Sequence, residues 1–74
     1  MPERLLRLTP SEVTSILRGH GFSLISQRGS HQKWRHASLT KQVIVPYHKA
    51  KQLPLGTLKS IIQGSGIAEE DFHL

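Results

Sequence analysis

The chain has 74 residues and a mass of 8.3 kDa, enough for one small domain with a single core. It contains no cysteine, which excludes disulfides and thiolate metal sites and fits a reducing compartment. Its longest apolar run in a predicted strand is Val43–Val45, far shorter than the roughly 18 residues of a membrane span. We therefore expect a single soluble, cytoplasmic domain over residues 1–74 that does not associate with membranes.

The charges are distributed unevenly along the chain. The net charge is +5, and the five carboxylates belong to Glu3, Glu12, Glu69, Glu70 and Asp71. The interval between Glu12 and Glu69 holds eight Lys or Arg residues, four histidines and no carboxylate. An unneutralised positive interval favours binding to a polyanion such as nucleic acid, although a generic solubilising surface is the simpler alternative.

The lack of carboxylates in this interval also limits the chemistry. Two-metal phosphodiesterases, glycosidase acid pairs and Ser-His-Asp triads all need Asp or Glu at the site. Histidine is then the natural proton carrier, which favours acid–base catalysis without a metal or other cofactor.

The first predicted element is a helix that begins at Thr9. Thr9 can act as the N-cap, Pro10 suits the first helical position, and Glu12 completes a capping box. Val13, Ile16 and Leu17 follow at helical spacing, and Gly19 or Gly21 ends the element.

Three strands are predicted next. The first runs over 22–27, with Phe22, Leu24 and Ser26 on one face, and ends at a Gly29-Ser30 turn. The second spans His31–His36, and a polar connection over 37–41 leads to the third, Gln42–Val45, which Pro46 stops.

A second helix is predicted over Pro54–Gln63, with Gly64 or Gly66 at its end. Gly56 in its first turn indicates either close packing against the sheet or a loose helix start. An acidic turn at 68–72 then returns Phe72 to the core. The predicted fold is therefore α+β, in the order α-β-β-β-α, with a three-stranded antiparallel sheet whose two helices cover one face.

The second strand predicts where the functional surface lies. Trp34 is the only tryptophan, and we expect it in the core beneath the helices. Because strand side chains alternate, His31, Lys33 and Arg35 should then face solvent on the opposite side. A histidine and two cations in a row would form a platform for phosphates.

The Gly29-Ser30-His31 turn carries the strongest chemical signal. Gly29 permits a tight turn, and the Ser30 hydroxyl can donate to a phosphate oxygen. A histidine can take the proton from an RNA 2′-hydroxyl, so His31 is the predicted general base, with Lys33 or Arg35 stabilising phosphoryl charge. The alternative is an ordinary surface histidine after a turn.

The remaining histidines are less informative. His48, just past the third strand, is a candidate proton donor or nucleic-acid contact, or else a structural histidine bonded to backbone. His31 and His36 should lie on opposite faces of one strand, so we expect no metal site. His20 and His73 have no identifiable role, and Thr57 is a helix-start hydroxyl.

These motifs make the chain resemble the HicA (YcfA-like) family of bacterial toxins over nearly its whole length. The residues that carry the resemblance are Gly29-Ser30-His31, Trp34, Val45-Pro46-Tyr47-His48, Lys51, Leu53, Gly56-Thr57-Leu58, Ile61, Gly66 and Phe72. The three-residue turn is a weak signal alone, but together with Pro-x-His and Gly-Thr-Leu at these spacings it is specific.

The resemblance implies a fold like the double-stranded-RNA-binding domain and metal-independent cleavage of mRNA in a toxin–antitoxin system. It also implies a small HicB-like antitoxin that covers the active face, and it makes His31 the catalytic residue. The residues expected to bind RNA are Arg28, Gly29, Ser30, Lys33, Arg35, His48 and Lys51.

Two other functions fit the same residues. A non-catalytic RNA-binding module would need the basic face but not the histidine chemistry. A protein-interaction domain would present that positive face to an acidic partner, and an antitoxin is one such partner.

Overall fold

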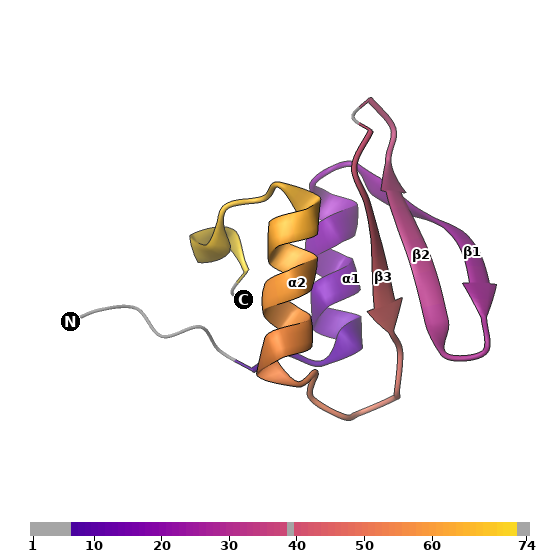
Figure 1. The fold of residues 1–74 in the computed structure, drawn as a ribbon, viewed down its shortest axis with the longest axis vertical. Helices are drawn as coiled ribbons and strands as arrows, with labels where there is room; N and C mark the ends of the chain where they lie inside the picture. The colour runs from indigo at the N-terminus through magenta and orange to yellow at the C-terminus, as the bar shows by residue number, and fades with distance from the viewer. Residues whose placement is uncertain (1–6, 39, 73–74) are drawn as a thin grey trace.

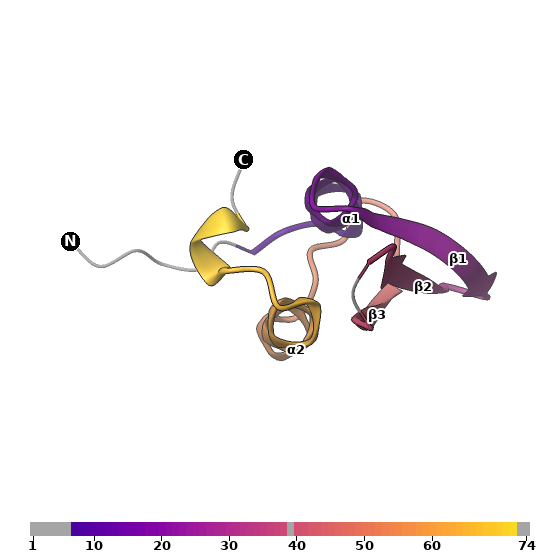
Figure 2. The same ribbon diagram turned by 90° about the horizontal axis from the view of Figure 1, so that it is seen from above.

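The computed structural model describes residues 7–38 and 40–72, and they form the predicted order of elements (Figure 1). These elements are α1 (Pro10–Gly19), β1 (Phe22–Arg28), β2 (His31–His36), β3 (Gln42–Pro46), α2 (Leu55–Ser65) and the short 3-10 helix η1 (Glu69–Asp71). The strands make an antiparallel sheet in the order β1-β2-β3. Both helices lie on the same side of this sheet (Figure 2), which confirms the predicted α+β architecture.

The start of α1 is fixed by the predicted capping box. The Thr9 N–H donates to Glu12 Oε1 at 2.8 Å, and the Glu12 N–H donates to Thr9 Oγ1 at 3.3 Å. Two N–H groups that a helix start would otherwise leave unpaired are thus satisfied. The apolar stripe of α1 then buries Val13 and Leu17 against the sheet.

Trp34 lies at the centre of the core, as predicted, with only 2% of its surface exposed. The guanidinium of Arg18 on α1 lies over its ring, 5.0 Å from the centroid. Phe72 returns from η1 to the same core and is 1% exposed, which confirms the predicted role of the acidic turn. The buried apolar residues are Leu8, Val13, Leu17, Phe22, Trp34, Val43, Val45, Leu53, Leu58, Ile61, Ile62 and Phe72.

The predicted alternation along β1 is wrong beyond Leu24. Leu24 pairs with Trp34 and Ser26 with Lys33, so a bulge leaves Ile25 without a partner. One extra residue in a strand reverses the facing of everything after it. Ser26 therefore lies on the Lys33 face and not on the face of Phe22.

Helix α2 differs slightly from its predicted bounds and packs through a different glycine. It ends at Gly66, whose left-handed conformation (φ 74°) terminates the helix. A Cβ on Gly56 would meet nothing within 4 Å, whereas a Cβ on Gly64 would lie 3.2 Å from Val43 Cγ1. The close approach of helix to sheet is therefore at Gly64, and the suggested role for Gly56 in packing is wrong.

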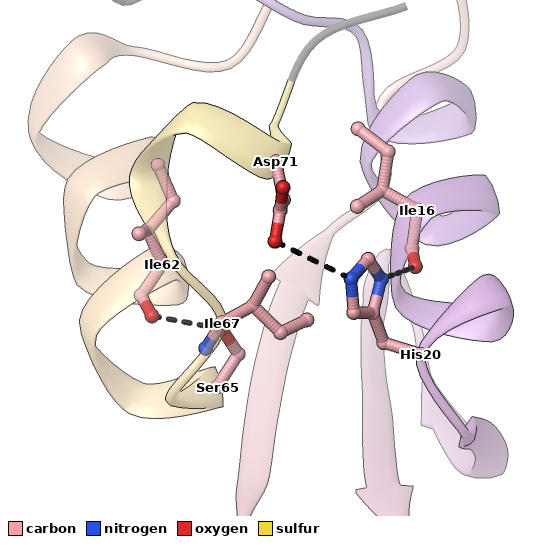
Figure 3. Close-up of polar contacts among 6 residues, drawn as sticks. All are labelled: Ile16, His20, Ile62, Ser65, Ile67 and Asp71. Carbon is pink, nitrogen blue, oxygen red and sulfur yellow. Dashed lines mark hydrogen bonds and ion pairs between the residues drawn. The ribbon is translucent and has the colours of Figure 1, made fainter.

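The end of α2 is held by Ser65, which is buried. Its hydroxyl donates to the Ile62 carbonyl at 2.8 Å and accepts from the Ile67 N–H at 3.1 Å (Figure 3). Both bonds turn the chain toward η1, so that Phe72 can reach the core.

Candidate nucleic-acid interface

The connection between β1 and β2 is a two-residue turn. Arg28 pairs with His31, which leaves Gly29 and Ser30 as the central residues. Gly29 has a φ of 60°, and Ser30 is not among the residues with positive φ. A two-residue turn with a positive φ at its first central residue but not at its second is a type II′ turn. Glycine is favoured at that first position because it has no Cβ to oppose a positive φ. This turn places His31 at the start of β2.

The His31 side chain is exposed, and strand alternation places it on the face of β2 opposite the buried Trp34. The helices leave this face of the sheet open (Figure 2). Within the described residues its ring takes part in no hydrogen bond, ion pair or ring contact. Its cross-strand neighbours are Arg28 on β1 and Pro46 on β3. The imidazole is therefore accessible and has a cationic residue as its cross-strand neighbour.

The open face continues along β2 through Lys33 and Arg35. Arg35 is exposed and Lys33 is half-buried. Alternate residues of a strand are about 6.7 Å apart, so Lys33 adjoins His31 while Arg35 lies about 13 Å away. Lys33 also lies opposite Ile44, which is 44% exposed. The face thus combines cations with an exposed aliphatic side chain.

A main-chain hydrogen bond joins the end of β3 to the turn. The Tyr47 N–H donates to the Ser30 carbonyl at 2.6 Å, one rung beyond the pairing of His31 with Pro46. His48 is the next residue along the chain from Tyr47 and lies beyond the end of β3. His48 is exposed, and the register brings its segment beside the turn.

The chain then turns sharply between His48 and Lys51. The Lys51 N–H donates to the His48 carbonyl at 3.1 Å, and Ala50 has a φ of 64°. A positive φ at the third turn residue is typical of a type II turn. Lys51 is exposed at the end of this turn, so it adds a cation close in sequence to His48.

A chain of side-chain hydrogen bonds supports the turn from the face that carries Trp34, and the sequence did not predict it. The Trp34 indole N–H donates to Gln32 Oε1 at 3.1 Å, and Gln32 Nε2 donates to Gln27 Oε1 at 3.3 Å. Gln27 Nε2 then donates to the Gly29 carbonyl at 3.0 Å. The pairing of Gln27 with Gln32 two residues outside the turn was the available signal, but glutamine alone predicts no partner.

Two other histidines have structural contacts. His36 packs edge-on against Phe22 with ring centroids 5.3 Å apart, and its Nδ1 accepts from the Ser38 N–H at 3.0 Å. His20 Nδ1 lies 3.0 Å from the Ile16 carbonyl, and its Nε2 lies 3.8 Å from Asp71 Oδ2 (Figure 3). The sequence suggested no role for His20, and the structure shows it linking α1 to η1. His73, like Leu39 of the predicted connection, lies outside the described residues.

No three His, Cys, Asp or Glu side chains gather into a possible metal site within residues 7–38 and 40–72. In the same ranges no helix has both the length and the apolar character needed to cross a membrane.

The comparison with protein families agrees with this architecture. The family model described as HicA toxin of bacterial toxin-antitoxin matches residues 10–67. That range runs from the start of α1 to the residue after the Gly66 cap, and it includes all three strands and the Gly29-Ser30 turn that precedes His31. A comparison with curated protein sequences returned no match. Because the family match spans well over half of the chain, the protein belongs to the HicA family of bacterial toxins.

Proposed function

We propose that this toxin is a metal-independent endoribonuclease that cleaves mRNA with His31 as its general base. Proteins of the HicA family are known as mRNA interferases, which supports the choice of substrate. The observation that carries the proposal is the position of the His31 ring. The ring is exposed on the open face, and its cross-strand neighbours are Arg28 and Pro46. Within the described residues it makes no hydrogen bond or ion pair that would hold its nitrogens.

The reaction needs two proton transfers. Neutral His31 takes the proton of a ribose 2′-hydroxyl, and the oxygen attacks the adjacent phosphorus. The bond from phosphorus to the 5′-oxygen breaks, that oxygen receives a proton, and the other fragment keeps a 2′,3′-cyclic phosphate. General base assistance contributes about 10²–10⁴-fold in rate.

His48, Lys33 and Arg35 are the candidate proton donors to the leaving oxygen. The register favours His48, because the bond from the Tyr47 N–H to the Ser30 carbonyl brings the segment that carries this exposed histidine beside the turn that precedes His31. An imidazolium also releases a proton near neutral pH far more readily than an ammonium or a guanidinium. The two cations of β2 are better suited to stabilising charge on the phosphoryl oxygens.

RNA binding is proposed for Arg28, Gly29, Ser30, Lys33, Arg35, His48 and Lys51. The first five belong to one hairpin, and the main-chain bond from Tyr47 to Ser30 brings the His48 segment next to it. Main-chain and cationic donors to phosphate give affinity that does not depend on base sequence. A HicB-like antitoxin is the proposed protein partner, and an acidic surface on it would complement the same face.

The experiment is cleavage of labelled mRNA by the purified protein in EDTA. We expect wild type to cleave and His31→Ala to lose at least a hundredfold in rate while remaining folded. His20→Gln is the matched control, because His20 is an exposed histidine bonded to Ile16 and Asp71 away from the turn. Undiminished cleavage by His31→Ala would refute the assignment.

The same assay tests the alternative of a non-catalytic RNA-binding module. The exposed Ile44, opposite Lys33, favours that alternative, because aliphatic contacts to bases need no histidine. A salt-sensitive mobility shift without any product would support it and exclude the nuclease.

A further inference from the structure

One peptide group in the Gly29-Ser30 turn is oriented so that its N–H can act as a hydrogen-bond donor. Type I′ and type II′ turns differ mainly by a flip of the peptide between their two central residues. In this chain that peptide joins the Gly29 carbonyl to the Ser30 N–H. The positive φ of Gly29, without one at Ser30, sets it in the type II′ orientation.

The Gly29 carbonyl points to the face of the sheet that carries Trp34. It accepts from Gln27 Nε2, and Gln27 is bonded to Gln32, which is bonded to the buried Trp34 indole. All three side chains are on the strand positions that alternate with His31. In a trans peptide the C=O and N–H point in opposite directions. The Ser30 N–H is therefore directed to the His31 face.

This N–H is an available donor. Within the described residues the Ser30 N–H has no hydrogen-bond partner. The carbonyl of the same residue is fixed by the Tyr47 N–H at 2.6 Å. Both peptide groups that flank the Ser30 Cα are thus held, one by Gln27 and one by Tyr47. A donor fixed in this way needs no rearrangement when charge develops beside it.

We propose that the Ser30 main-chain N–H donates to a non-bridging oxygen of the phosphate that lies beside His31, and that Gln27 is a positioning residue for this donor. The inference rests on the proposed function for the identity of the ligand as a phosphodiester. Main-chain N–H groups at turns are common phosphate ligands, so the chemistry needs no additional charge. The sequence suggested the Ser30 hydroxyl as the phosphate donor, but a hydroxyl can rotate and is therefore less preorganised than the main-chain N–H.

The direct test is amide NMR during titration with a short RNA whose ribose 2′-hydroxyls are methylated, so that it cannot be cleaved. We expect the Ser30 amide proton to move downfield on binding, by more than the neighbouring amides that are already bonded within the sheet. We expect Gln27→Leu to reduce that shift, whereas Gln63→Leu, the same change on an exposed α2 residue, leaves it intact. An unchanged Ser30 signal during saturable binding overturns the proposal.

A kinetic test uses the turn itself. The double change Gly29→Asn with Ser30→Gly converts the turn to Asn-Gly, which prefers type I′ and flips the central peptide while keeping a two-residue hairpin. We expect cleavage to fall about 10²–10³-fold, as for loss of a main-chain-type oxyanion donor, with the hairpin register retained by amide NMR. Gln27→Leu should lower kcat by several-fold with KM little changed. Wild-type kcat in the flipped turn contradicts the proposal.

The outcomes separate this inference from the proposed function. If the protein binds the methylated RNA with a Ser30 shift but never cleaves unmodified RNA, the Ser30 N–H is supported as a phosphate ligand and the nuclease activity is refuted. If the protein cleaves RNA and His31→Ala abolishes cleavage while the Ser30 amide signal does not move, the nuclease activity is supported and the role of the Ser30 N–H is refuted.

Discussion

The four histidines of the described chain differ in what their rings contact. His20 and His36 have partners that tie α1 to η1 and β2 to the following connection. The rings of His31 and His48 have no such partner among the described residues and are exposed. Both lie at the end of the sheet where β1 turns into β2. His20 is also exposed, so the absence of a ring contact within the described residues, rather than exposure alone, distinguishes His31 and His48 as suited to proton transfer.

The cations of the open face predict a specific salt dependence. Each phosphate that a cation neutralises on single-stranded RNA contributes about −0.7 to the slope of log affinity against log salt concentration. Arg35→Gln should therefore make the slope shallower by about 0.7. Lys59→Gln is the control, because Lys59 is also exposed but belongs to α2 on the covered side of the sheet. Equal slopes for Arg35→Gln and wild type would mean that Arg35 neutralises no phosphate of the bound RNA.

Ala50 is the only non-glycine residue with a positive φ among the described residues. A left-handed conformation costs an L-residue with a Cβ roughly 1 kcal/mol, and glycine avoids most of that cost. Ala50→Gly should therefore raise the free energy of unfolding by about 0.5–1 kcal/mol, less any entropy that glycine adds to the unfolded chain. Urea denaturation measures this change. A lower midpoint would mean that the turn after β3 is not strained.

At the scale of elements, most of the fold could be predicted because each boundary has a local chemical cause. Thr9, Pro10 and Glu12 fix the start of α1, and Gly29-Ser30 fixes the turn between β1 and β2. The bulge at Ile25 could not be predicted, because consecutive Leu and Ile carry no signal for which residue loses its partner. The choice between Gly56 and Gly64 as the contact glycine likewise depended on how α2 approaches β3, which only tertiary packing decides.

The two α2 glycines make a paired prediction. Glycine within a helix costs about 0.8–1 kcal/mol relative to alanine. Gly56→Ala should gain most of this stability, because its Cβ would meet nothing within 4 Å. Gly64→Ala should gain less or lose stability, because its Cβ would lie 3.2 Å from Val43 Cγ1.

Urea midpoints of the two variants, measured side by side, decide the order. Equal stabilisation by both substitutions would mean that α2 lies farther from β3 than the structure places it.

At the scale of the whole molecule, the two sides of the sheet have different roles. One side packs Trp34, Val43 and Val45 beneath the helices, and the other presents His31 and the β2 cations. The acidic η1 lies beyond the helices, on the side away from the sheet (Figure 2). Its carboxylates therefore do not neutralise the open face, and the positive field there can attract a polyanion.

The candidate site was predictable only in part from the sequence. Strand alternation placed His31, Lys33 and Arg35 on one face and Trp34 on the other, and their burial agrees with that placement. The amide chain from Trp34 through Gln32 and Gln27 to Gly29 was not predictable, because it depends on side-chain rotamers across two strands. The direction of the Ser30 N–H depends on that same chain and on the turn type.

The most direct test of His31 as general base is the chemical identity of the new ends when wild-type protein cuts mRNA in EDTA. Attack by a 2′-hydroxyl, which His31 would deprotonate, leaves a 2′,3′-cyclic phosphate on one fragment and a free 5′-hydroxyl on the other. Mass spectrometry of the fragments distinguishes these ends from those of hydrolysis by an activated water. We expect the cyclic phosphate and the 5′-hydroxyl. A 3′-hydroxyl with a 5′-phosphate would contradict the mechanism, since the 2′-oxygen would then have taken no part.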